Sequence, residues 1–162
     1  MTRLLASLLL AVLASTPFQA QNPSPKPNLT GTWVFSPQKS ALKIDAPTSM
    51  TLHIDQTDLQ ISFARSQAYG EQKFDWKLET VADGQKEVVQ ESPAYKANVR
   101  AYWEGNSLVL DQKITASDGT QATDMVTYSL ADNGKMLQAV ERQTTVGGKG
   151  SVTNKWVYEK KP

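Results

Sequence analysis

The stretch Leu29-Thr-Gly-Thr-Trp-Val-Phe35 is the first strand-like run of the chain, and the fold is best inferred from it. Gly31 and Trp33 stand two positions apart, so their side-chain positions share one face of an extended strand. Glycine lets another backbone or a ring approach closely, and a tryptophan is large enough to plug one end of a barrel. Gly31 and Trp33 are therefore predicted to close a barrel at its base, although an ordinary edge strand can also hold such a pair.

The rest of the chain repeats a two-residue alternation of apolar and polar side chains. Met50–Ile54 and Leu59–Phe63 are two such runs, and short turns such as Asp83-Gly84 and Asp118-Gly119 separate the others. A meander of this length leaves two exposed edges unless it closes on itself. The sequence therefore predicts an all-β fold, an up-and-down antiparallel meander of about 8–10 strands closed into a lipocalin-like barrel.

The first 20 residues have the pattern of a secretory signal peptide. Arg3 precedes an apolar run from Leu4 to Ala14, and small or polar residues follow up to Ala20, after which cleavage is expected. The apolar run is about half the roughly 20 residues that cross a bilayer, which makes a retained anchor the weaker alternative. Residues 21–28 hold three alternating prolines and are predicted to be an extended linker, and residues 29–160 form the barrel domain.

Charge and cysteine content indicate which cellular compartment and which classes of binding partner to expect. The chain has 17 basic and 16 acidic residues, and cleavage after residue 20 removes Arg3 alone, leaving equal numbers of each. A neutral mature chain argues against nucleic acid and acidic membranes as partners. No cysteine is present, so the protein forms no disulfides. We expect it to be exported to a bacterial periplasm or to the outside of the cell. We expect no membrane span after processing.

Several short motifs, in order along the chain, resemble those of bacterial secreted lipocalin-like domain proteins. They are Leu29–Trp33 with Ser36–Ser40, Trp103–Val109, Tyr128–Lys135 and Trp156–Lys160. The resemblance implies a small calycin-type barrel in which Gly31 and Trp33 match the Gly-x-Trp pair that closes the base. Many lipocalins stack an arginine from the last strand on that tryptophan, whereas the last strand here offers Lys155 and Lys160. The resemblance implies no particular ligand.

Catalytic and metal-binding chemistry has little support in the sequence. His53 is the only histidine and stands between Leu52 and Ile54, on the polar face of a predicted strand. A triad would depend on that residue, and a zinc site needs three or four ligands of the histidine or cysteine type. The sequence therefore predicts no catalytic residues, no metal, no cofactor and no enzymatic activity.

A run of alternating residues near the middle of the chain suggests an apolar interior with room for a ligand. Ala97 and Ala101 are small inward positions, which either leave space or accommodate aromatic rings from neighbouring strands. Binding or carriage of a small apolar or amphipathic molecule ranks first, an envelope interaction or inhibitor module second and an unrecognised enzyme third, with the oligomeric state left open. The predicted ligand-binding residues are Phe63, Phe74, Trp76, Ala97, Val99, Ala101, Trp103 and Tyr128.

Overall fold

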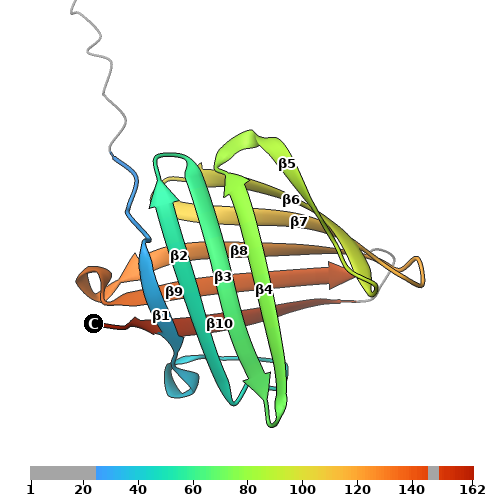
Figure 1. Cartoon of the computed structure of the whole chain (residues 1–162), viewed down its shortest axis with the longest axis horizontal. Helices are drawn as coiled ribbons and strands as arrows, with labels where there is room; N and C mark the ends of the chain where they lie inside the picture. The colour runs from blue at the N-terminus through green and yellow to red at the C-terminus, as the bar shows by residue number, and fades with distance from the viewer. Residues whose placement is uncertain (1–24, 146–149) are drawn as a thin grey trace, which may run out of the picture.

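The computed structural model describes residues 25–145 and 150–162, and these fold into one ten-stranded antiparallel sheet (Figure 1). The signal peptide predicted for residues 1–20 lies outside the described residues. The strands are β1 (Gly31–Phe35), β2 (Ser49–Thr57), β3 (Gln60–Tyr69), β4 (Gln72–Val81), β5 (Asp83–Glu91), β6 (Tyr95–Glu104), β7 (Ser107–Ala116), β8 (Gln121–Ala131), β9 (Met136–Thr145) and β10 (Ser151–Lys160). Two short 3-10 turns, η1 (Pro37–Lys39) and η2 (Asp132–Gly134), complete the described part.

The predicted all-β meander is confirmed, and the alternation in the sequence explains which face of each strand is buried. On β2, Met50, Leu52 and Ile54 are at most 3% exposed, while His53 between them points outward and is exposed. Leu52 pairs with Arg65 of β3 and Ile54 with Phe63, and paired residues share a face. The inward face therefore continues from strand to strand.

The sheet curls into a nearly closed barrel whose two halves cross. The strand order is β4-β3-β2-β1-β10-β9-β8-β7-β6-β5, so β1 and β10 are neighbours near its middle and β4 and β5 are its two edges. In Figure 1, β1 to β4 run steeply across the front and β6 to β10 run roughly at right angles behind them. Orthogonal packing of this kind encloses one apolar layer between the two halves. No ladder joins β4 to β5 among the described strands, and the barrel stays open there.

The beginning of β5 differs from the sequence-based interpretation. Asp83-Gly84 was predicted to be a hairpin turn, but both residues belong to β5, and the register with β6 shifts between Asp83 and Glu87. Gly84 has a φ of +73°, which glycine adopts without strain, and the Asp83 carboxylate accepts hydrogen bonds from the backbone N–H groups of Gln85 and Lys86. The extra residues form a bulge at the start of β5.

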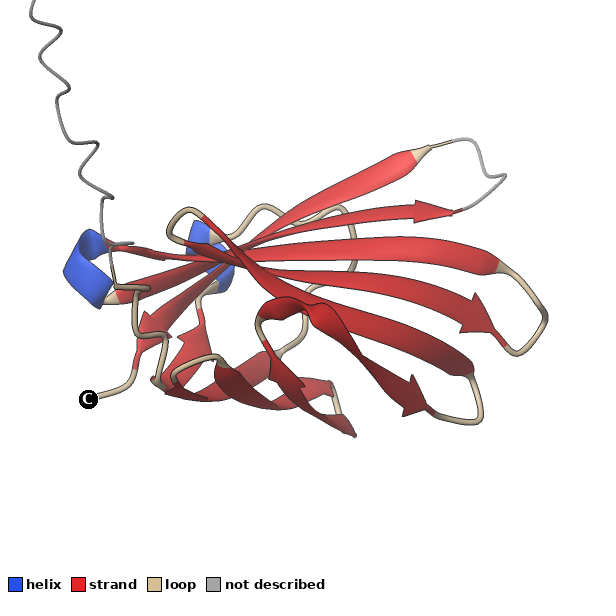
Figure 2. Ribbon diagram, turned by 90° about the horizontal axis from the view of Figure 1, so that it is seen from above, coloured by secondary structure: helices blue, strands red, loops and turns tan. Residues whose placement is uncertain are grey.

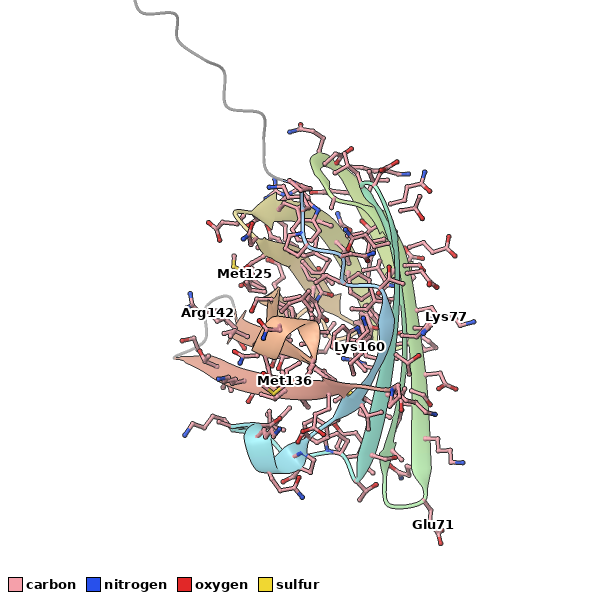
Figure 3. The ribbon with its side chains drawn as sticks, turned by 90° about the vertical axis from the view of Figure 1, so that its left-hand side faces the viewer. Glu71, Lys77, Met125, Met136, Arg142 and Lys160 are labelled. Carbon is pink, nitrogen blue, oxygen red and sulfur yellow. The ribbon has the colours of Figure 1, made fainter. Side chains whose placement is uncertain are left out.

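Trp33 has no exposed surface. Its indole Nε1 donates a hydrogen bond to the Leu29 carbonyl oxygen at 3.0 Å, and Lys160 Nζ lies 5.2 Å from the ring centroid. Figure 3 shows Lys160 between the two halves of the barrel, whereas Lys77 points outward. A Cβ on Gly31 would lie 2.8 Å from Lys160 Cε, so the glycine makes room for this lysine. Lys160 thus occupies the position beside the tryptophan that many lipocalins give to an arginine.

The N-terminal approach and the longest connection both attach to the barrel. The Gln56 side chain accepts a hydrogen bond from the Leu29 N–H at 2.9 Å and donates one to the Pro27 carbonyl oxygen at 3.1 Å, which fixes the end of the predicted linker. After β1, the chain runs alongside β10, where the Ser36 N–H donates to the Val157 carbonyl oxygen at 2.8 Å. These bonds leave little freedom for the segment that flanks β1.

Candidate functional site

The eight residues predicted to bind a ligand all lie at inward positions, and three of them form one aromatic cluster. The ring of Phe63 lies 5.5 Å from that of Tyr128 and 6.2 Å from that of Trp76, measured between centroids. These residues come from β3, β8 and β4, so the cluster spans both halves of the barrel. It forms the centre of the interior.

The other predicted residues lie apart from this cluster. Ala97, Val99 and Ala101 of β6 are at most 1% exposed and belong to the packed core. Phe74 is half exposed and packs edge-on against Tyr69, with 6.1 Å between ring centroids. Trp103 is partly buried against the core. None of the eight lines the two cavities described below.

An inward-facing arginine, absent from the sequence-based set, borders the aromatic cluster. The Arg65 guanidinium carbon lies 5.1 Å from the Trp76 ring centroid, and Trp76 Nε1 donates to Gln90 Oε1 at 2.8 Å. Arg65 Nε is buried without a hydrogen-bond partner in the described part of the chain. Arg65 follows Phe63 by two residues, so the alternation of the strand already placed its side chain inside.

Glu141 of β9 is the acceptor at the centre of a second polar group. Its Oε2 accepts hydrogen bonds from Asn154 Nδ2 at 2.8 Å and from Trp156 Nε1 at 2.9 Å, and its Oε1 accepts one from Gln143 Nε2 at 3.3 Å. Three donors engage this half-buried carboxylate, which offsets part of the cost of withdrawing it from water. Glu141 is absent from the site residues predicted from the sequence.

Asp124 of β8 is the least satisfied acidic side chain in the interior. The residue is 7% exposed, and its Oδ2 accepts a hydrogen bond from Gln112 Nε2 at 3.2 Å. Its Oδ1 is buried with no partner among the described residues. Burial, followed by the negative charge of Glu141, raises the pKa of Asp124 to about 7, while Arg65 and the Gln143 amide oppose the change.

Two tyrosine hydroxyl groups complete the polar interior and stay neutral at physiological pH. Burial raises the pKa of Tyr128 to about 12, and burial together with the neighbouring Tyr128 raises the pKa of Tyr158 further. The Tyr158 hydroxyl lies 3.9 Å from Met50 Sδ, a weak acceptor. Both tyrosines can therefore donate hydrogen bonds but contribute no charge.

The larger cavity is a cleft of about 620 Å³ at the gap between β4 and β5. Three inward residues, Ile61, Thr80 and Val88, lie at its inner side, and Thr80 Oγ1 is buried without a hydrogen-bond partner in the described structure. The cleft is lined by Asp55, Thr57, Gln60, Ile61, Ser62, Glu79, Thr80, Val81, Lys86, Glu87 and Val88. Its lining combines a small apolar floor with polar and charged side chains.

A smaller pocket of about 210 Å³ lies on the inner face of β7 to β10, near the ends where these strands spread apart (Figure 2). Asp124 is part of its lining, together with the apolar side chains of Ile114, Ala122 and Val152. Gln143 and Thr145 add hydrogen-bonding groups. Asp124 therefore borders a pocket, although its unpaired Oδ1 has no accessible surface of its own.

Residues 25–145 and 150–162 contain no group of three or more histidine, cysteine, aspartate or glutamate side chains placed to hold a metal ion. Within the same ranges, no helix has the length and apolar character needed to span a membrane. His53 lies outside the barrel, where Thr32 Oγ1 is 3.0 Å from its Nδ1 and Asp55 is 3.2 Å from its Nε2.

No protein-family model matches the sequence, and no curated protein shows significant similarity to it. Some solved structures are similar to it in fold. A secretory abundant heat soluble protein from Ramazzottius varieornatus superposes with a TM-score of 0.56 at 12% identity, covering 84% of this chain and 98% of that one. Apo lipid binding protein 8 from Caenorhabditis elegans gives a TM-score of 0.54 at 14% identity, covering 82% and 95%. At these identities the similarity extends to the fold alone, an antiparallel β-barrel.

Proposed function

We propose that this protein is an exported barrel that binds a small amphipathic molecule in the cleft between β4 and β5. The observation that carries the proposal is the cleft itself, because its volume of about 620 Å³ falls within the roughly 300–1,000 Å³ of ordinary ligand sites. It lies where the hydrogen-bonded ladder stops, so a ligand can enter without breaking strand pairing.

The chemistry of the cleft favours a molecule with an apolar body and a polar group. Ile61 and Val88 provide apolar surface on the inner side, and the Thr80 hydroxyl offers a buried hydrogen bond that no described protein group takes. A ligand atom that pairs with Thr80 would remove the cost of leaving this hydroxyl unpaired. The similar fold of a protein named for lipid binding in Caenorhabditis elegans supports the same class of ligand.

Export is the second part of the proposal and rests on residues 1–20. An apolar core of this length behind Arg3 is typical of a cleaved signal peptide. We expect mass spectrometry of the protein from its native host to show a mature chain starting near Gln21, in the periplasm or the medium of a bacterium. Recovery of the chain from the cytosol with Leu4–Ala14 intact would contradict export without affecting the cleft.

Enlarging Val88 is expected to block the cleft. Its side chain points inward from β5, so the Val88→Phe variant should bind the apolar fluorescent probe N-phenyl-1-naphthylamine about tenfold more weakly than the parent. The measurement is a fluorescence titration, with far-UV circular dichroism to confirm that the strands are retained. Larger side chains at packed positions cost about 1–3 kcal/mol, so the titration is done well below the unfolding temperature.

The matched control is Val89→Phe, the same substitution one residue later. Val89 is 51% exposed on the outer face, and this variant should bind the probe as the parent does. If both variants bind the probe equally weakly, the loss of binding would come from a general disturbance of strand β5 and not from filling the cleft. If the parent binds none of a panel of apolar probes, the barrel acts as an interaction module through its outer surface.

A further inference from the structure

The 210 Å³ pocket at the spread ends of β7 to β10 differs from the β4–β5 cleft in place and in charge. The two cavities share no lining residue. The lining of the smaller cavity includes Asp124, which is only 7% exposed. One of its carboxylate oxygens has no hydrogen-bond partner among the described residues. A buried acceptor without a donor is costly, and a pocket beside it offers room for the missing donor.

When Asp124 is ionised, above its raised pKa of about 7, the charges around the pocket add up to an excess of one negative charge. Arg65 of β3 is the one cation that opposes Asp124, and Glu141 of β9 is the second anion. None of these three residues takes part in the ion pairs closer than 4.0 Å that the described chain forms. Tyr128 and Tyr158 face the same interior as neutral hydroxyls. A positive group would therefore balance the ionised form of Asp124.

We propose that this pocket binds a compact organic ammonium ion, with Asp124 as its counterion and Ile114, Ala122 and Val152 against its apolar part. Gln143 and Thr145 are the further lining groups able to accept hydrogen bonds from an ammonium, which has three N–H donors to satisfy. The apolar side chains suit a short hydrocarbon body. This site is independent of the proposed cleft between β4 and β5.

Two other occupants fit the pocket less well. A carboxylate would meet the unpaired oxygen of Asp124 and the nearby charge of Glu141, so repulsion disfavours it. A divalent metal ion needs several oxygen ligands, but the Glu141 oxygens are already engaged by Asn154, Trp156 and Gln143. An ammonium needs one charged acceptor and tolerates amide and hydroxyl oxygens as the others.

The test compares three probes of equal chain length: hexylammonium, hexanol and hexanoate. Isothermal titration calorimetry of the full mature chain at pH 8 should give hexylammonium a dissociation constant about tenfold or more below those of the other two. Binding of hexylammonium should weaken about tenfold at pH 5.5, because Asp124 is then protonated. At pH 7 the binding should release protons, seen as a dependence of the heat on the buffer.

Two variants locate the binding. Asp124→Asn should reduce hexylammonium affinity about tenfold and leave hexanol unchanged, while Asp75→Asn, which removes an equal charge from the outer face of β4, should change neither. Ala122→Phe fills the pocket and should abolish binding of hexylammonium in a folded protein. Hexanoate binding as tight as hexylammonium, or full affinity in Asp124→Asn, would overturn the proposal. Neither result bears on probe binding in the β4–β5 cleft.

Discussion

Replacing Trp33 by alanine is expected to lower the free energy of unfolding by about 3–5 kcal/mol, the usual cost of deleting a fully buried aromatic side chain. Trp33 has no exposed surface, and the sequence predicts that it closes the base of the barrel. Its loss also leaves the Leu29 carbonyl oxygen without the indole donor and Lys160 without the ring. Urea unfolding followed by circular dichroism measures the change.

The control for Trp33 is Phe74→Ala, which removes a large aromatic side chain that is half exposed. This variant should cost about 1 kcal/mol or less, since only part of the ring is withdrawn from water. Trp33→Phe should fall between the two, because it retains a ring but loses the hydrogen bond to Leu29. Indistinguishable unfolding midpoints for Trp33→Ala and Phe74→Ala would disprove the role of Trp33 in closing the base.

Asp124 is expected to make stability fall as the pH rises from about 4 to about 7. Its pKa is raised from 3.8 in the unfolded chain to about 7 in the folded one, so over this interval the folded state holds a proton that the unfolded state has released. The contribution of the protonated Asp124 carboxyl to the free energy of unfolding is complete below pH 4. It is lost once this carboxyl ionises in the folded protein. At about 1.4 kcal/mol for each pH unit, the loss amounts to about 3–4 kcal/mol.

Asp124→Asn removes this dependence without a large change of shape. The free energy of unfolding of the variant minus that of the parent should rise by about 3–4 kcal/mol between pH 4 and pH 8, which makes the variant relatively more stable at high pH. Urea titrations at five pH values, with Asp75→Asn as an exposed control, provide the comparison. A difference that stays constant across this pH range would show that the Asp124 pKa is not raised by burial.

Most of the barrel could be predicted from the sequence because strand alternation is local. Met50, Leu52 and Ile54 face the core at the expected period, and the meander follows from short turns. The position of Asp83-Gly84 could not be predicted in this way, since the same dipeptide serves both a hairpin turn and a bulge within a strand. The choice depends on how β5 pairs with β6, which is a long-range property.

The polar groups of the interior were missed for a related reason. Asp124 and Tyr128 share one face of β8, so alternation alone places Asp124 inward. An inward aspartate can still reach water if its strand end is uncovered, and whether it does depends on how far the facing half of the barrel extends. The 7% exposure of Asp124 reflects the crossing of the two halves, which no single strand encodes.

The pairing of β1 with β10 also sets an order of assembly. The ladder joins Trp33 to Lys160 and Phe35 to Tyr158, so the two segments that meet near the middle of the sheet come from opposite ends of the domain. Every other ladder connects neighbours along the chain and can form as a hairpin while synthesis continues. The two halves therefore cannot pair with each other until β10 has been made, and joining them closes a loop that contains nearly the whole domain. The sheet therefore stays incomplete during synthesis. A polypeptide that has not completed its fold can still pass through a narrow pore.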